Sequence, residues 1–166
     1  MNRFVLDTDP VVAARYHCDK HVVKMIVEEA QMLSTVHRQF GSFDERLYRA
    51  THRHHPCTVW AGASTANYEW AYRLFVELCA EYTRRYKRVH ATARLLAALV
   101  SPPAGVPVGG LTSFPQAMPE VLRGDDPVVA YRLFYMLEKA RFARWTGCEV
   151  PSWFVPVELG NLATLR

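Results

Sequence analysis

The chain has 166 residues, of which 50% are hydrophobic, and its formal net charge is +4 at pH 7. A chain of this length can bury a sizeable core in one domain, so neither a cofactor nor a disulfide is needed to explain its stability. The four cysteines form no CxxC pair, the first residues do not resemble a signal peptide, and no apolar run approaches the ~18 residues of a membrane span. We therefore expect a soluble, cytoplasmic protein with no membrane partner.

The N-terminal half has the periodicity of helices. Asp9 followed by Pro10 is typical of a helix start, because the aspartate caps free N–H groups and proline fits the first turn. Apolar residues then recur at helical spacing, which predicts one helix over 10–36, and Gly41 interrupts the pattern. Further helices are expected from Pro56, over 65–88 and, as a short element, over 91–100.

The C-terminal half begins with an expected loop over 101–120, which contains five prolines and three glycines. Asp126 and Pro127 repeat the cap-and-proline pattern, and the helix that they start is expected to run to about Trp145. Residues 147–166 are expected to form an irregular tail. Because no segment alternates with a period of two, we predict an all-α fold: a single compact domain of three main helices, with short helices and the Pro/Gly-rich loop.

The densest polar chemistry of the chain lies in the stretch YHCDKHVVKMIVEEAQ, residues 16–31. At about 100° per residue, Cys18 falls on the apolar face of the predicted helix and His21 at its border. A thiol in apolar surroundings is a poor nucleophile, which argues against catalysis by a cysteine and a histidine. The polar side is expected to carry His17, Lys20, Lys24, Glu28, Gln31 and Thr35.

Two glutamates are expected to lie among apolar side chains. Glu29 projects near the centre of the apolar face of the first long helix, and Glu138 falls within the aromatic stripe of the last. A buried carboxylate must be paired, protonated or facing a cavity, because an unpaired buried charge costs several kcal/mol. We expect a polar cavity between these two helices, although each glutamate could equally be satisfied by a core arginine, tyrosine or backbone group.

Cations alternate with aromatic residues in two segments, RRYKRVH over 84–90 and EKARFARW over 138–145. This pattern suits phosphate contact combined with base stacking in a nucleic-acid complex. The alternative is that both segments are the solvated C-terminal turns of helices, where cations also interact favourably with the helix dipole.

Histidines offer a metal-binding alternative. His17 and His21 are four residues apart, as two ligands on one helix face would be, and the histidines of 52–55 could supply a third ligand. Lys20 and Lys24 argue against this site, because they place positive charge beside an incoming cation. We expect no metal, and a metal-dependent enzyme using these histidines is kept as an alternative.

The order of motifs along the chain resembles a known family. The chain begins MNR, and His21 and Glu28 are seven residues apart on the first long helix. The middle of the chain contains the stretch HPCTVWAGASTANYEWAYRLF. Its last part contains FPQAMPEVLRGDDPVVAYRLF, followed by PSWF. This layout resembles the phage pyrimidine-dimer DNA glycosylases (endonuclease V), and also an uncharacterised phage-type family of similar layout.

The resemblance implies an enzyme that flips a base and cleaves an N-glycosidic bond in DNA or a nucleotide. The N-terminal α-amine, here that of Met1, would attack the sugar C1′ and form an imine, with AP-lyase activity as a further consequence. Glu28 would act as the acid/base, assisted by His21. Substrate and phosphate contacts are expected from Arg3, His17, Lys20, Lys24, His55, Gln116, Lys139 and Arg141.

One residue departs from the pattern of that family. Its nucleophile is exposed by removal of Met1, which requires a small second residue, whereas Asn2 is large. Either Met1 itself supplies the amine, or Glu28 and His21 drive hydrolysis with a water nucleophile. A non-catalytic nucleic-acid-binding protein of phage type is the remaining alternative, and no cofactor is expected in any of these cases.

Overall fold

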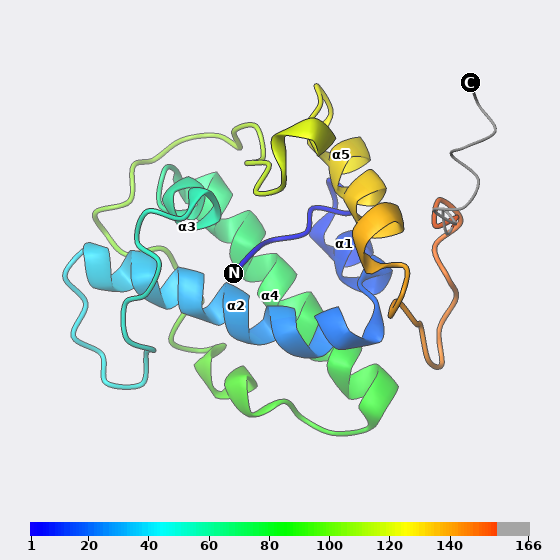
Figure 1. Cartoon of the computed structure of the whole chain (residues 1–166). Helices are drawn as coiled ribbons and strands as arrows, with labels where there is room; N and C mark the ends of the chain where they lie inside the picture. The colour runs from blue at the N-terminus through cyan, green and yellow to red at the C-terminus, as the bar shows by residue number, and fades with distance from the viewer. Residues whose placement is uncertain (156–166) are drawn as a thin grey trace.

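The computed structural model describes residues 1–155, and every regular element within them is helical (Figure 1). The elements are α1 (Pro10–Tyr16), α2 (Asp19–Gln39), α3 (Pro56–Ala61), α4 (Thr65–Tyr86) and α5 (Pro127–Phe134), with the 3₁₀ helices η1 (Ala91–Leu95) and η2 (Glu120–Leu122) and the π turn η3 (Tyr135–Lys139). The predicted all-α class is confirmed. No helix in this part of the chain is long and apolar enough to cross a membrane.

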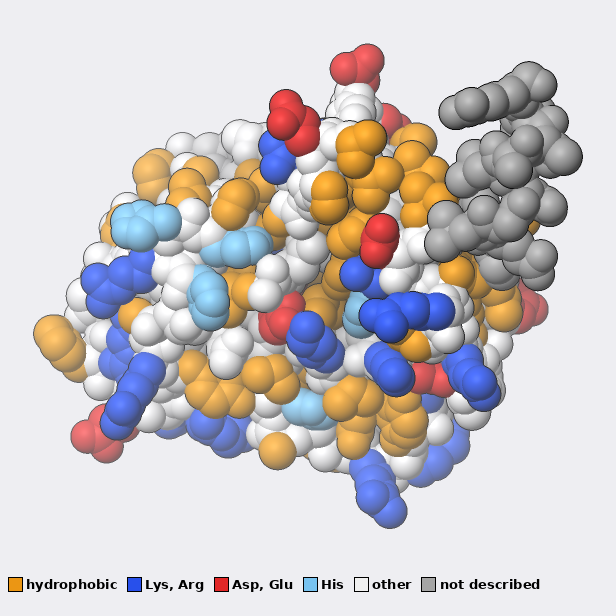
Figure 2. Space-filling view, viewed as in Figure 1, with side chains coloured by type: hydrophobic (Ala, Val, Ile, Leu, Met, Phe, Trp, Pro, Cys, Tyr) orange, Lys and Arg blue, Asp and Glu red, His pale blue; other side chains and the backbone are white. Residues whose placement is uncertain are grey.

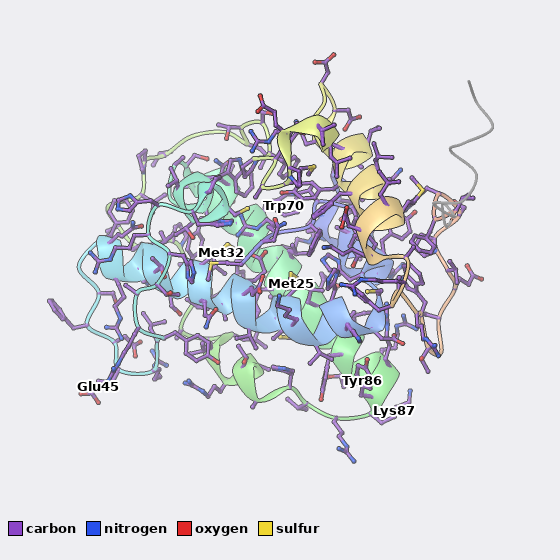
Figure 3. All side chains as sticks on the ribbon, in the orientation of Figure 1. Met25, Met32, Glu45, Trp70, Tyr86 and Lys87 are labelled. Carbon is purple, nitrogen blue, oxygen red and sulfur yellow. The ribbon has the colours of Figure 1, made fainter. Side chains whose placement is uncertain are left out.

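The two long helices, α2 and α4, form the centre of the molecule. They cross one another, with α1 packed on α4 and α3 on α2 (Figure 1). Met25 and Met32 lie along α2, and Trp70 lies near the start of α4 (Figure 3). These three side chains are buried in the core of the protein. Each fully buried apolar side chain of this size stabilises the fold by roughly 1.5–3 kcal/mol.

The expected helix over 10–36 is in fact two helices. His17 and Cys18 both have extended backbone, with ψ angles of 132° and 163°, and they separate α1 from α2. The new N-terminus of α2 is satisfied from a distant segment, because the N–H of Asp19 donates to the carbonyl of Arg144 at 2.8 Å. The prediction of one continuous helix is therefore wrong. At the start of α1, the Asp9 side chain accepts from the N–H of Val11, as predicted.

In the C-terminal part of the structure, the last helix is shorter than predicted. Asp126 caps α5 as expected, but the helix widens into η3 and ends at Lys139 instead of near Trp145. Glu138 lies in this widened turn and is exposed, so the expectation that it is buried in the aromatic stripe is wrong. The loop predicted over 101–120 is irregular until η2 begins at its last residue. Residues 147–155 of the predicted tail contain no helix, and the remainder lies outside the described residues.

Candidate active site

The N-terminal segment meets Glu28 on the face of α2 (Figure 1). The backbone N–H of Asn2 donates to Oε2 of Glu28 at 2.8 Å, and the α-amine of Met1 lies 4.0 Å from Oε1. Lys24, one turn earlier on the helix, places its Nζ 3.2 Å from the same Oε1. The Glu28 side chain is only 10% exposed, so its carboxylate sits among positive and N–H groups at a partly covered position.

A buried ion pair fixes this segment to the helix. Arg3 binds the carboxylate of Glu29 with its Nη2 at 2.6 Å, and both side chains are fully buried. Its Nη1 also donates to the carbonyl of Cys57 at 3.1 Å, which connects the segment to α3. Glu29 is therefore paired with a positive charge. Pairing was one of the three outcomes expected for a carboxylate on the apolar face. Arg3 was expected to contact phosphate, but in this structure it is enclosed and holds the N-terminal segment in place.

Asn2 fixes the other side of the segment. Its Nδ2 donates to the carbonyl of Ala117 at 2.9 Å, and its Oδ1 accepts from the hydroxyl of Tyr131 at 3.3 Å. The adjacent Gln116 exchanges two hydrogen bonds with the backbone of Gly124, which closes the loop between them. Gln116, a predicted substrate contact, thus borders the site through its neighbour Ala117.

His21 occupies a covered position beside the N-terminal segment. Its ring stacks on Phe4 with centroids 4.5 Å apart, and its Nδ1 is hydrogen-bonded to the hydroxyl of Tyr135. Burial, together with the positive charge of neighbours such as Lys139, lowers the pKa of His21 to about 3. The imidazole is therefore neutral at neutral pH, and only one of its two ring nitrogens carries a proton.

His21 and Glu28 do not form a direct pair. They lie two helical turns apart, about 10.5 Å along α2, and no hydrogen bond joins them in the described part of the chain. Lys24 lies between them and contacts Glu28. The structure thus brings Met1 to Glu28 and leaves His21 at the far end of the same edge. Sequence reasoning gave Phe4 no role, although a large aromatic directly after MNR was a usable signal.

A cationic edge extends from this site. We call Lys20, Lys24, Lys139 and Arg141 the basic edge. Figure 2 shows Lys and Arg side chains gathered over the N-terminal end of α2. Lys20 and Arg141 lie over the ring of Phe142, at 5.0 and 5.7 Å from its centroid. They border an open hollow of about 460 Å³ with Asp19, Phe142 and Arg144. Burial lowers the pKa of Lys139, which lies over Phe134.

The other predicted cationic segment, 84–90, is less available for contact with nucleic acid. Arg84 and Arg85 both bind the carboxylate of Glu81, and Arg85 also binds Asp19 at 3.0 Å with no exposure of its side chain. Lys87 remains exposed at the end of α4 (Figure 3). Two of the four cations of this segment, Arg84 and Arg85, are therefore paired within the protein.

The histidines do not assemble into a metal site in the described residues. His17 was expected on the polar side of the helix, which is wrong: the break before α2 turns it into the core, where it is fully buried. Its Nδ1 bonds the carbonyl of Ala13 at 2.7 Å, and burial lowers its pKa to about 4. Within residues 1–155, no group of three or more His, Cys, Asp or Glu is placed to hold a metal ion.

The fold and the site together define an all-helical protein in which a primary amine and a carboxylate meet beside a cationic, aromatic edge. The family model for pyrimidine dimer DNA glycosylases matches residues 1–94, and the chain belongs to this family. The matched span carries the N-terminal segment, α1 to α4 and most of η1, and so includes Met1, Glu28 and His55. No curated protein and no solved structure matches the chain.

Proposed function

We propose that this protein is a DNA glycosylase that cleaves an N-glycosidic bond with Glu28 as its catalytic carboxylate. One observation supports this most directly: the carboxylate of Glu28 lies 4.0 Å from the α-amine of Met1 and accepts the N–H of Asn2. A nucleophilic amine beside a partly covered carboxylate suits attack on a sugar carbon that develops positive charge. Membership of a DNA glycosylase family makes DNA the expected substrate.

The proposed reaction begins at C1′ of the target nucleotide. The α-amine of Met1 forms a bond to C1′, and the electron pair of the C1′–N bond leaves with the base, which takes up a proton. Opening of the sugar ring then yields an imine between Met1 and C1′. Glu28 stabilises the positive charge at C1′ and accepts a proton from the attacking amine. In the alternative mechanism, Glu28 activates a water that attacks the same carbon.

The basic edge would hold the DNA backbone. Lys20 and Arg141 lie over the half-buried ring of Phe142 and Lys139 over the buried ring of Phe134, so the stems of these cations are supported by aromatic surface. Such cations neutralise phosphates and release counterions, which gives most of the affinity of a DNA-binding surface. Flipping of a nucleotide would then bring its C1′ to Glu28.

The substitution Glu28→Gln tests the proposal. It removes the charge but little volume, so base release from DNA containing pyrimidine dimers should fall by roughly 100-fold or more, the usual contribution of an acid/base group. DNA binding, measured by fluorescence anisotropy, should be retained. Glu45→Gln is the matched control, because the same change at an exposed glutamate far from the site should leave the rate unchanged. Full activity of Glu28→Gln would overturn the proposal.

Borohydride decides between the two mechanisms. Reduction during turnover should link the protein covalently to labelled DNA, and peptide mapping should find the adduct on Met1. Base release without a trapped adduct would assign the water mechanism to Glu28. Salt-sensitive DNA binding with no base release from any substrate would instead favour a non-catalytic DNA-binding protein.

A further inference from the structure

We infer that Lys24 is a positioning residue, which keeps the carboxylate of Glu28 ionised and directed at the α-amine of Met1. This inference rests on the proposed function. Lys24 places its Nζ 3.2 Å from Oε1 of Glu28, and the α-amine lies 4.0 Å from the same oxygen. The sequence predicted a phosphate contact for Lys24, whereas its charge in the structure lies beside the proposed catalytic carboxylate.

The two oxygens of Glu28 have different partners, and together these partners fix the carboxylate. Oε2 accepts the backbone N–H of Asn2 at 2.8 Å, while Oε1 faces Lys24. Asn2 is itself fixed, because its Nδ2 donates to the carbonyl of Ala117. A carboxylate oxygen has two lone pairs, so Oε1 can accept from Lys24 and still take a proton from the amine. Without Lys24, only Oε2 would be held, and Oε1 could move away from the amine.

The charge of Lys24 also supports the protonation state that the proposed reaction needs. The amine must be neutral when it attacks, because a protonated amine has no free electron pair, and Glu28 must still be ionised to accept its proton. The Glu28 side chain is only 10% exposed, and at such a position an opposite charge within about 4 Å favours the ionised form. A neutral amine no longer supplies that charge, whereas Lys24 does.

Two other basic side chains that were predicted to contact the substrate are engaged elsewhere. Arg3 binds Glu29 in the core, and His55 caps α3 through its Nδ1. Stabilisation of α2 is a weak alternative reason for the contact between Lys24 and Glu28. In isolated helices, a lysine four residues before a glutamate is the less favourable order of such a pair. The contact is therefore better explained by the carboxylate that it serves.

The substitution Lys24→Met tests the inference. It removes the charge and keeps most of the stem, and because the side chain is 65% exposed, the fold should remain intact. At saturating DNA containing pyrimidine dimers, the single-turnover rate of base release should fall about tenfold. The slope of log K against log salt for DNA binding should be unchanged, since the charge is engaged with Glu28. Lys24→Arg restores the charge and should recover most of the rate.

Lys87→Asn is the control for loss of a lysine charge. Lys87 lies at the exposed end of α4, so this variant should keep both the rate and the salt slope of the wild type. If Lys24→Met instead lowers the salt slope by about 0.9 and keeps the full rate, then Lys24 is a phosphate contact and the inference is overturned.

The dependence on Glu28 provides a second measurement. If Lys24 acts through Glu28, then Lys24→Met should cause no further decrease when it is added to Glu28→Gln, as measured on the residual rate. An equal tenfold decrease in both backgrounds would overturn the inference, because Lys24 would then act independently of the carboxylate.

These outcomes distinguish the inference from the function on which it rests. A full rate in Lys24→Met, together with an inactive Glu28→Gln, would overturn the role of Lys24 alone and leave the proposed glycosylase in place. Full activity of Glu28→Gln would overturn the proposed function itself, and with it the role of Lys24.

Discussion

Arg3 and Glu29 form an ion pair at 2.6 Å in which neither side chain is exposed to solvent. This pair sets the register of the N-terminal segment on α2, because it places the preceding residue, Asn2, against the preceding glutamate, Glu28. Adjacent helical residues point about 100° apart, so one glutamate of the EE pair enters the core while the other remains beside the amine. The two neighbouring carboxylates thus have separate tasks, one in structure and one proposed in catalysis.

Breaking this pair should strongly destabilise the protein. Arg3→Met or Glu29→Met leaves one buried charge without its partner, which costs about 3–5 kcal/mol in the free energy of unfolding. The double variant should recover much of this loss, because it removes both charges and fills the space with apolar atoms. Urea denaturation of the three variants measures the effect. Single variants as stable as the wild type would contradict this prediction.

Substituting the second residue should move the proposed nucleophile. Asn2→Thr makes residue 2 small enough for removal of Met1, and the new α-amine would take the position of the Asn2 nitrogen, 2.8 Å from Oε2 of Glu28. Imine trapping should therefore increase, with intact mass confirming the loss of methionine.

Asn2→Gln is the control for this change. It keeps a large second residue, and therefore Met1, while disturbing the hydrogen bond to Ala117. Trapping should fall in this variant. If processed Asn2→Thr protein traps less than Asn2→Gln, then the loss of the asparagine contacts outweighs the new position of the amine.

Local signals in the sequence predicted the fold well, and distant partners explain the errors. Asp9 starts a helix because its cap contacts lie within two residues, which the sequence displays directly. The break at Cys18 depends on Arg144, more than a hundred residues away, and apolar periodicity continues across it. Similarly, the position of Glu29 showed that it needed a partner but not that Arg3 would be that partner.

In the candidate site too, the sequence predicted which residues take part, whereas their arrangement depends on the fold. The resemblance to DNA glycosylases nominated Met1 and Glu28 together, and the structure places them 4.0 Å apart. No helical pattern within α2 predicts this distance, since it depends on how the N-terminal segment crosses the helix.

Stability should fall in acid partly because of His21. Its pKa is about 3 in the folded protein and about 6.5 in an unfolded chain, so between these values the unfolded chain binds a proton that the folded protein does not. The free energy of unfolding must then decrease as the pH falls from about 6.5 towards 3. His21→Gln keeps a side chain that can hydrogen-bond to Tyr135 and removes this titration. For this variant, the slope of the free energy of unfolding against pH, between pH 6 and 4, should be smaller than in the wild type by about 1.4 kcal/mol per pH unit.

Urea denaturation at several pH values measures this slope, and NMR titration of the His21 ring provides a direct check. A ring midpoint near 6.5 in the folded protein would contradict the prediction. His17, whose pKa is about 4, should contribute in the same direction and remain in the His21→Gln variant. Because His21 stays neutral near pH 7, it should not account for changes in activity between pH 6 and 8.

The basic edge should determine how DNA binding depends on salt. Removing one phosphate contact lowers the slope of log K against log salt by about 0.9 for duplex DNA. Lys20→Ala and Lys139→Ala should each lower the slope by about this amount, and the single-turnover rate of bound DNA should change little. Lys24 is unsuitable for this test, because it also contacts Glu28.

Lys87→Asn is the matched control for the basic edge. It removes a positive charge at the exposed end of α4, and asparagine tolerates the left-handed backbone that Lys87 adopts, with φ of 54°. Its salt slope should equal that of the wild type, because Arg84 and Arg85 are engaged with Glu81 and DNA is expected at the basic edge. If the salt slope falls strongly in Lys87→Asn but not in Lys20→Ala or Lys139→Ala, then the DNA-binding surface lies at the end of α4 instead.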